Sequence, residues 1–304
     1  MGNGRAPSGA GALSGDDRQR IGASTGFVVL LGDPVGHSLS PALHNAAFRE
    51  QGLDLVYLAC AVEADGLGAA MDGLWALGAL GANVTIPHKR DALAYASDAT
   101  PTARALGAAN TLVRTESGWR ADNTDVAGFL APLQPHRSQL ADASVVVLGA
   151  GGAARAVVYG AAVGLGASAV TIVARRPEQA EGLADDLGGI AGETELRVST
   201  PADAGPSLRE AALAVNATPL GMGDGRTPWP DSQDFHDGQI VYDLVYRPAR
   251  TPLLEAAEKR GATPIGGLPM LLGQAGDAYR QWTGHDFPHA VARAAALTTL
   301  GQDA

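Results

Sequence analysis

The sequence is poor in cysteine and carries no excess of positive charge. Cys60 is the single cysteine among 304 residues, so the chain cannot form an internal disulfide, and a reducing compartment such as the cytoplasm is expected. This cysteine lies in the apolar stretch 57–62 without a histidine or second cysteine beside it, and we expect a buried, structural thiol. The formal net charge of −10 argues against a nucleic-acid partner, which would need a basic surface.

The sequence also lacks the hydrophobic runs that direct a chain to a membrane. Residues 1–24 are rich in Gly, Ala and Ser and have no apolar core of a secretory signal, so we predict a flexible tail there. Residues 145–174 are apolar, but they include Arg155 and several glycines and divide into a strand, a helix and a second strand. We therefore expect a cytoplasmic protein without membrane contact, as a monomer or a homodimer.

The first half of the chain alternates strand and helix patterns. Short apolar runs typical of buried strands lie at residues 27–31, 55–62 and 81–86. Helices are predicted between them at 40–51 and 64–77, the first with Ser40 as its N-cap and Pro41 as its first residue. This alternation indicates an α/β fold with a mostly parallel sheet.

The alternation restarts at residue 144 in the order of a dinucleotide-binding domain. Strands are predicted at residues 144–148, 169–173, 212–216 and 239–244. Helices are predicted at residues 153–165, 176–187, 252–260 and 269–283, with one more after Pro288.

A glycine-rich turn follows the strand at 144–148 and opens the next helix, which is the context that makes such a motif informative. Gly149 allows the turn, and Gly151 and Gly152 let a phosphate approach the backbone. Ala154 takes the place of the third glycine, and the helix N-terminus offers free N–H groups to a pyrophosphate. The alternative is a purely structural glycine turn.

The strand at 169–173 is followed by Arg175 and Arg176, where an NAD enzyme would usually carry an acidic residue for the ribose 2′-hydroxyl. Arginine suits a 2′-phosphate through charge-assisted, often bidentate hydrogen bonds. The sequence therefore favours NADP as the cofactor. A solvated arginine pair at the end of a strand is the alternative.

Polar side chains gather at the ends of the first-half strands. Ser38 and Ser40 are two residues apart, and in an extended segment both hydroxyls would face one carboxylate; Ser40 could instead only cap a helix. Asn83 and Thr85 share one face of a strand, and Lys89 lies beyond its carboxyl end, where ligands bind in parallel α/β folds. A lysine there, taken alone, is more often a surface charge.

Further polar groups, Asn110, Asp122 and Asp125, lie in predicted turns, and either aspartate could be an ordinary helix cap. The histidines of this half, His37, His44 and His88, do not have metal-ligand spacing with carboxylates, so no metal site is predicted.

Eight ordered segments between Phe27 and Trp282 together resemble the shikimate dehydrogenase family. They are GDPVGHSLSPALHN, GANVTIPHK, GAANTLV, DNTD, GAGGAARA, NATPLGM, YDLVYRPARTPLL and GLPMLLGQAGDAY. The resemblance implies a substrate domain at residues 25–124 and 267–304 and a Rossmann-type NADP-binding domain at 125–266, with C-terminal helices packing on the substrate domain. It implies NADPH-dependent, reversible reduction of 3-dehydroshikimate to shikimate, a step toward chorismate and the aromatic amino acids.

The resemblance also assigns roles residue by residue. It implies that Lys89 and Asp125 are the catalytic pair. The residues that it places on the substrate are Ser38, Ser40, Thr85, Asn110, Asp125, Tyr246 and Gln274. The residues that it places on the cofactor are Gly149, Gly151, Gly152, Ala153, Arg175, Gly267 and Met270, and Arg176 can supply a further charge.

One departure from the family concerns the arginines. The family often shows Asn-Arg-Thr at this strand end with a basic residue three positions later, whereas this chain has Ala174-Arg175-Arg176 and Gln179. Three alternatives remain: a quinate or aminoshikimate dehydrogenase, a non-catalytic binding protein, and a folate-linked dehydrogenase. Arg175 argues against an NAD-linked quinate enzyme. The presence of both Lys89 and Asp125 argues against a non-catalytic binding protein. The paired serines and Gln274 argue against the folate-linked enzyme.

Overall fold

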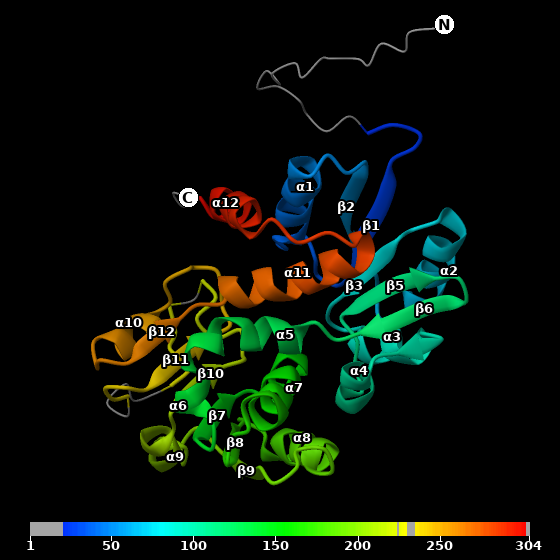
Figure 1. Ribbon diagram of the computed structural model, residues 1–304. Helices are drawn as coiled ribbons and strands as arrows, with labels where there is room; N and C mark the ends of the chain where they lie inside the picture. The colour runs from blue at the N-terminus through cyan, green and yellow to red at the C-terminus, as the bar shows by residue number, and fades with distance from the viewer. Residues whose placement is uncertain (1–20, 224, 230–234, 302–304) are drawn as a thin grey trace, which may run out of the picture.

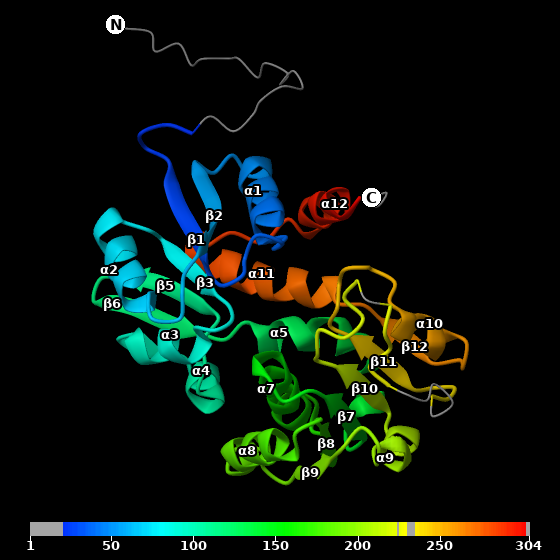
Figure 2. The same cartoon turned by 180° about the vertical axis from the view of Figure 1, so that it is seen from behind.

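The structure is a computed structural model that describes residues 21–223, 225–229 and 235–301 (Figure 1). It contains two six-stranded sheets, and the helices α5 (Asp125–Leu130) and α11 (Leu268–Thr283) run between them (Figures 1 and 2). The α/β, two-domain prediction is therefore confirmed.

The first sheet has the order β2-β1-β3-β5-β6-β4. Its strands are β1 (Gly26–Gly32), β2 (Leu55–Ala61), β3 (Gly81–Val84), β4 (Asp98–Ala99), β5 (Thr111–Thr115) and β6 (Gly118–Asp122). Its helices are α1 (Ser40–Glu50), α2 (Leu67–Leu77), α3 (Lys89–Tyr95) and α4 (Pro101–Leu106). The pairs β3–β5 and β5–β6 are antiparallel and the remaining pairs parallel.

The second sheet is entirely parallel, in the order β12-β11-β10-β7-β8-β9. Its strands are β7 (Ser144–Leu148), β8 (Ala169–Val173), β9 (Glu195–Ser199), β10 (Leu213–Asn216), β11 (Ile240–Asp243) and β12 (Thr263–Ile265). Its helices are α7 (Gly152–Tyr159), α8 (Pro177–Gly188), α9 (Gly205–Glu210) and α10 (Pro252–Glu258). The chain order reverses between β7 and β10, which is the switch point where Rossmann-type domains bind nucleotides.

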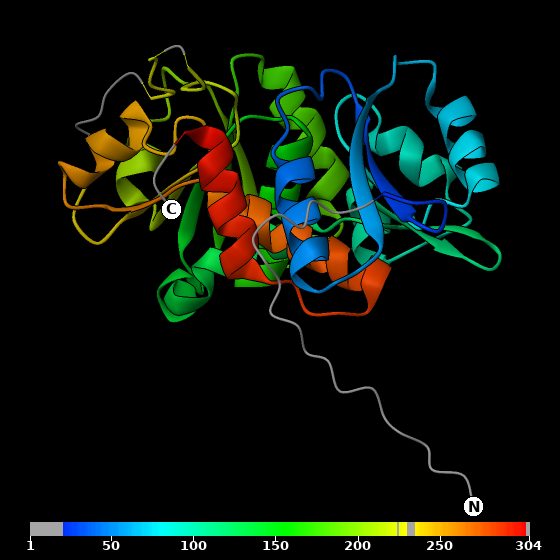
Figure 3. The ribbon, with the colours of Figure 1, turned by 90° about the horizontal axis from the view of Figure 1, so that it is seen from above.

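Hydrophobic cores cover both faces of each sheet, as parallel strands require. All five residues of β8 are buried, which explains its continuous apolar pattern. The last helix, α12 (His289–Leu300), packs beside α1 on the first sheet (Figures 1 and 3). The short helices η1 (Ala131–His136) and α6 (Arg137–Leu140) follow α5 and lead into the second sheet.

Two glycines allow α5 and α11 to cross closely. A Cβ added at Gly128 would lie 2.7 Å from the backbone oxygen of Met270 and 2.8 Å from the backbone nitrogen of Gln274. On the facing helix, a Cβ at Gly273 would lie 3.0 Å from the Cα of Gly128. This crossing fixes the position of α11 relative to α5, and with it the positions of Met270 and Gln274.

Most predicted elements are confirmed within a few residues, and the differences are local. Leu39, not Ser40, is the N-cap of α1, and Ser40 is the first helical residue. The backbone N–H of Ser40 donates to Ser38 Oγ at 3.2 Å, so the segment is a turn rather than extended. The predicted helix at 64–77 begins at Leu67, since residues 63–66 form a turn closed by a hydrogen bond from the Gly66 N–H to the carbonyl of Glu63.

Two further differences concern a helix and the cysteine. The segment predicted as a helix at 153–165 is helical throughout, but its second half is a π-helix, η2 (Gly160–Leu165), in which Gly160 and Gly164 lie against Phe129 and Leu130 of α5. Cys60 is only partly buried, since β2 is an edge strand.

The predicted tail is mostly outside the described residues, which begin at residue 21; residues 21–24 are exposed. Residues 145–174 form strand, helix and strand, as predicted. In the described part of the chain, no helix is long and apolar enough to cross a membrane.

Candidate active site

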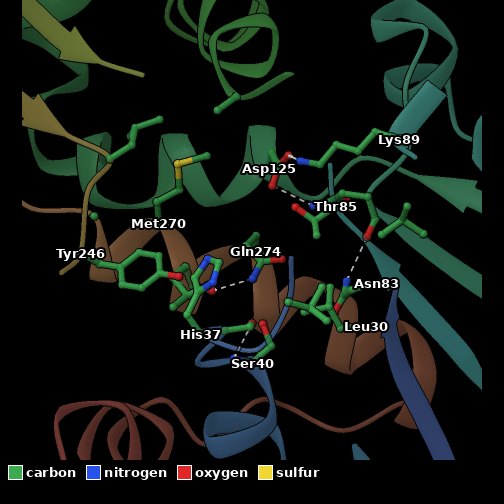
Figure 4. Close-up of a pocket in the computed structure, with 18 of the residues that line it drawn as sticks. Leu30, His37, Ser40, Asn83, Thr85, Lys89, Asp125, Tyr246, Met270 and Gln274 are labelled. Carbon is green, nitrogen blue, oxygen red and sulfur yellow. Dashed lines mark hydrogen bonds and ion pairs between the residues drawn. The ribbon is translucent and has the colours of Figure 1, made fainter. Parts of the chain in front are cut away.

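A cavity of about 300 Å³ lies between the first sheet, α11 and the second sheet (Figure 4). Both halves of the chain line it, with Lys89 and Asp125 on one side and His37 and Ser40 on the other (Figure 4). The residues that line it are Leu30, Pro34, Val35, His37, Ser38, Ser40, Asn83, Val84, Thr85, Lys89, Asn110, Asp125, Ala153, Leu244, Tyr246, Gly267, Met270, Leu271 and Gln274.

Lys89 and Asp125 form the closest charged contact in this cavity. Lys89 is the first residue of α3, after the end of β3, and Asp125 is the first residue of α5. The ammonium Nζ donates to Asp125 Oδ2 at 2.5 Å, and both side chains are mostly buried. The second carboxylate oxygen, Oδ1, accepts from Asn110 Nδ2 at 2.8 Å. Asp125 therefore holds a fixed position between an ammonium and an amide.

The residues behind Asp125 form a buried hydrogen-bond network. Asn110 Oδ1 accepts from the backbone N–H of Thr124 at 2.8 Å and from Thr111 Oγ1 at 3.0 Å. Asn83 Nδ2 donates to the carbonyl of Asn110 at 3.1 Å and to Thr111 Oγ1 at 3.1 Å. Because these amides have buried partners, their orientation toward the cavity is fixed.

The opposite side of the cavity offers hydroxyls and an imidazole. Ser40 is buried. Ser38 is the last residue of a turn, which is closed by a hydrogen bond from its N–H to the carbonyl of Val35 at 3.0 Å. Tyr246 comes from the segment after β11, and burial raises the pKa of its phenol. Gln274, on α11, donates from Nε2 to the carbonyl of Leu271 at 3.0 Å, which leaves its amide oxygen free to accept.

The glycine-rich turn lies at the second-sheet side of the cavity and fits a pyrophosphate. Gly149 has φ +119°, and a Cβ there would lie 3.0 Å from the carbonyl oxygen of Ala217. Around Gly151 no described atom lies within 4 Å of an added Cβ, and at Gly152 the nearest is Lys89 Cδ at 3.8 Å. Gly151 and Gly152 are exposed, so phosphate oxygens can approach their backbone amides, whereas the Gly149 N–H donates to the carbonyl of Val173 at 2.8 Å and shapes the turn.

Arg175 and Arg176 lie away from the cavity, at the end of β8. Both side chains are exposed and form no hydrogen bond or ion pair with other described residues. Arg176 is the N-cap of α8, which places its charge beside the positive end of that helix. Two exposed arginines at this strand end fit the 2′-phosphate of NADP.

The predicted site residues fall into three groups. The cavity brings together Ser38, Ser40, Thr85, Lys89, Asn110, Asp125, Ala153, Tyr246, Gly267, Met270 and Gln274. Gly149, Gly151 and Gly152 do not line the cavity but lead into Ala153, which does, and Arg175 and Arg176 lie apart. Asp122, the other aspartate considered with Asp125, is not part of the lining; it ends β6 and accepts from Thr100 Oγ1 at 2.6 Å.

The sequence assigned no ligand-binding role to two residues that line the cavity, His37 and Asn83. It also gave no indication of Tyr57, which contacts Asn83. The buried Tyr57 hydroxyl donates to Asn83 Oδ1 at 2.8 Å and so orients that amide. The sequence signal for Tyr57 is weak, since a tyrosine in an apolar strand is usually just core. In the described residues, no cluster of His, Cys, Asp or Glu could hold a metal ion.

The Rossmann-type sheet, the glycine-rich turn and the Lys–Asp cavity define the class: a two-domain, nucleotide-dependent oxidoreductase. Residues 30–112 match the family described as the shikimate dehydrogenase substrate binding domain. Over 275 residues the chain is 52% identical to the shikimate dehydrogenase (NADP(+)) of Salinibacter ruber, which covers 89% of this chain and 96% of that relative. The chain belongs to the shikimate dehydrogenase family.

Solved structures agree with this assignment. A shikimate 5-dehydrogenase from Thermus thermophilus, in complex with NADP(H) and shikimate, is 36% identical with a TM-score of 0.79, over 90% of this chain and 99% of that one. A quinate dehydrogenase from Corynebacterium glutamicum, in complex with NAD, is 31% identical with a TM-score of 0.84, over 90% and 99%. The fold is thus common to both activities, and the side chains must distinguish them.

Proposed function

We propose that this protein is an NADP-dependent shikimate dehydrogenase, which reduces 3-dehydroshikimate reversibly to shikimate on the route to chorismate and the aromatic amino acids. The observation that carries the proposal is the Lys89–Asp125 contact of 2.5 Å inside a cavity that also reaches the glycine-rich turn. Relatives that are 52%, 45% and 42% identical to this chain are shikimate dehydrogenases (NADP(+)), which favours shikimate as the substrate.

Lys89 and Asp125 would do the proton chemistry. When bound, NADPH supplies the hydride, and the reacting carbonyl oxygen gains negative charge in the transition state. The Lys89 ammonium would stabilise this charge and supply a proton, while Asp125 holds the ammonium and hydrogen-bonds the reacting hydroxyl. Asn110 would keep Asp125 in place through its 2.8 Å hydrogen bond.

The remaining polar groups would position the substrate. Ser38 and Ser40 would bind its carboxylate with Tyr246, and Thr85 and Gln274 would accept or donate hydrogen bonds at the ring hydroxyls. These groups lie on several sides of one cavity of about 300 Å³, which is at the lower end of the usual size for a small-molecule site.

The cofactor would lie along the second sheet. Its pyrophosphate would contact Gly149, Gly151, Gly152 and Ala153, and its nicotinamide would lie near Gly267 and Met270. Arg175 would bind the 2′-phosphate, and Arg176 would supply the charge that Gln179 lacks. The support is the exposed backbone at Gly151 and Gly152 and the two exposed arginines at the end of β8.

We infer domain limits from the same arrangement. The substrate domain would comprise residues 25–124 and 267–304, and the NADP-binding domain residues 125–266. The packing of α11 and α12 with α1 in one core supports this division. The enzyme would act in the cytoplasm, as a monomer or a homodimer.

The decisive test is a spectrophotometric assay of the purified protein with shikimate, quinate and aminoshikimate, each with NADP and with NAD. We expect the highest kcat/KM for shikimate with NADP. A higher value for quinate or aminoshikimate would reassign the substrate, and a preference for NAD would reject the role of the arginines. No turnover with any pair would point to a binding protein instead.

A further inference from the structure

The cavity has little positive charge available for an anionic substrate. Among the residues that line it, only Lys89 and His37 can carry a positive charge. Lys89 already contacts the carboxylate of Asp125 at 2.5 Å, so the two charges largely cancel. His37 is therefore the group left to balance a negative charge that enters the cavity.

His37 is also on the side of the cavity that the paired serines occupy. It lies in the segment between β1 and α1, one residue before Ser38 and three before Ser40. Its ring lies between Tyr246 and Gln274, across the cavity from Lys89 and Asp125 (Figure 4). The imidazole makes no hydrogen bond to another described residue, so both ring nitrogens can serve a ligand.

We propose that the His37 imidazolium binds the carboxylate of the substrate together with Ser38 and Ser40. The inference rests on the proposed function, because it needs a substrate with a carboxylate at this end. It makes affinity for the substrate depend on pH, since imidazole is the side chain that gains its charge between about pH 5 and 8.

Few charged groups compete with this interaction. From the cavity walls, the titratable groups that face His37 are Tyr246, next to it, and Lys89 and Asp125, on the far side. α11 contributes Met270, Leu271 and Gln274, all uncharged, to the lining. The nearest charged neighbours in sequence, Asp33 in the same segment and Arg247 after Tyr246, do not line the cavity.

The test compares shikimate with its neutral methyl ester. In the full-length enzyme, the KM for shikimate should rise about three- to tenfold from pH 6 to pH 8.5, as expected when a partly exposed charge pair is lost. The inhibition constant of methyl shikimate, measured against shikimate, should stay constant over the same range, because the ester has no charge for His37 to bind.

Three variants separate charge from structure. His37→Asn should show a high KM that no longer varies with pH, while kcat stays near the wild-type value. His37→Lys should keep a low KM at pH 8.5, which a merely structural role would not predict. His285→Asn, an exposed histidine outside the cavity, is the matched control and should behave as the wild type. Thermal unfolding of each variant checks that it folds.

The outcomes are distinct. A His37→Asn enzyme with wild-type KM and wild-type pH dependence would overturn the inference, as would a methyl ester whose inhibition follows the same pH profile as shikimate binding. If the wild-type enzyme does not oxidise shikimate at all, the proposed function fails instead.

Discussion

At the scale of single residues, Asp125 is held in place by hydrogen bonds from three sides. One of its oxygens accepts from Lys89 and the other from Asn110, and its backbone N–H donates to Asn123 Oδ1 at 3.2 Å. A carboxylate with both oxygens engaged cannot rotate freely. Its position therefore fixes where the Lys89 ammonium lies, as the proposed catalytic role of Lys89 requires.

Replacing Lys89 with alanine tests this arrangement. We expect kcat to fall about 10²–10⁴-fold, the usual contribution of a general acid–base group, while the protein stays folded. The control is Lys259→Ala, which removes the only other lysine of the chain from an exposed position in the second half. Steady-state kinetics of both variants with shikimate and NADP provide the measurement. A Lys89→Ala enzyme with near wild-type kcat would reject the catalytic role.

Arg175 and Arg176 give a second prediction at this scale. Since neither side chain is engaged by another described residue, replacing both with alanine should leave the fold intact. We expect the KM for NADP to rise about tenfold or more, as charge-assisted hydrogen bonds to the phosphate are lost, with little change for NAD. Equal effects on both cofactors would mean that the arginines do not contact the 2′-phosphate. Arg260→Ala, just after α10, serves as a control in the same half, because its exposed side chain makes no hydrogen bond or ion pair with another described residue.

At the scale of elements, the crossing of α5 and α11 sets the geometry of the cavity. Gly128→Ala would push a methyl group against backbone atoms of Met270 and Gln274, which cannot move as a side-chain end can. We expect a loss of about 1–3 kcal/mol in the free energy of unfolding, typical of overpacking, and a higher KM for shikimate as Gln274 shifts.

Gly182→Ala is the matched control for this substitution. Gly182 is inside α8, is exposed, and has nothing described within 4 Å of an added Cβ. Alanine there should be neutral or stabilise the protein, because it lowers the entropy of the unfolded chain. Urea unfolding of both variants measures the difference. Equal stability changes at the two positions would show that the helices adjust without cost.

The packing of α1 against α11 contains a buried histidine with a predictable response to pH. His44 stacks on Tyr57 with ring centroids 4.5 Å apart, and neither ring nitrogen has a hydrogen-bond partner among the described residues. Burial lowers the pKa of His44 from 6.5 to about 3. Unfolding therefore takes up a proton at any pH between these values, so stability is complete above pH 6.5 and falls as the pH falls toward 3.

This proton linkage sets how much His44 contributes to the free energy of unfolding at each pH. Between pH 7 and pH 5, His44 should remove about 2 kcal/mol from the free energy of unfolding. His44→Phe should lose that part of the acid sensitivity, because an apolar ring has no proton to gain, whereas the exposed His285→Asn should keep it. Urea unfolding at both pH values provides the comparison. The interpretation fails if His44→Phe and the wild type lose the same stability on acidification.

Elements with a strong local pattern could be predicted from the sequence, and those defined by long-range pairing could not. The strand 144–148 and the strand 169–173 match β7 and β8 residue for residue, because buried parallel strands are continuous apolar runs. β5 and β6 went unrecognised because polar residues such as Thr111 and Arg120 interrupt them and only their antiparallel pairing makes them strands.

The same limit applies to the site. The turn at Gly149 and the position of Lys89 after β3 follow from local sequence. The contact between Lys89 and Asp125 spans 36 residues and depends on how α5 leaves β6, so only the family resemblance anticipated it. Tyr57 is a second example, because it orients Asn83 through a hydrogen bond that no local sequence pattern encodes.

At the scale of the whole molecule, catalysis requires two halves to meet, and charged side chains bridge them beside the glycine-rich turn. Arg155, on α7, donates to the carbonyl of Leu106 at the end of α4 at 3.2 Å, and it also pairs with Asp186 on α8. Arg90, on α3, reaches Asp186 at 3.3 Å. These contacts join the helices that carry Lys89 and Gly152, whose relative position would set the distance between substrate and cofactor in the proposed function.

Arg155→Met tests whether this bridge aligns the two halves. Arg155 has a side chain only 14% exposed, whereas Arg104, which pairs with Asp98 within the first half, is 62% exposed and makes Arg104→Met the control. Because small misplacements of reacting groups are costly, kcat of Arg155→Met should fall about tenfold or more, while Arg104→Met keeps wild-type kcat. Small-angle X-ray scattering should show a larger radius of gyration for Arg155→Met and an unchanged one for Arg104→Met. Wild-type kcat together with unchanged scattering would mean that α5 and α11 align the halves without the bridge.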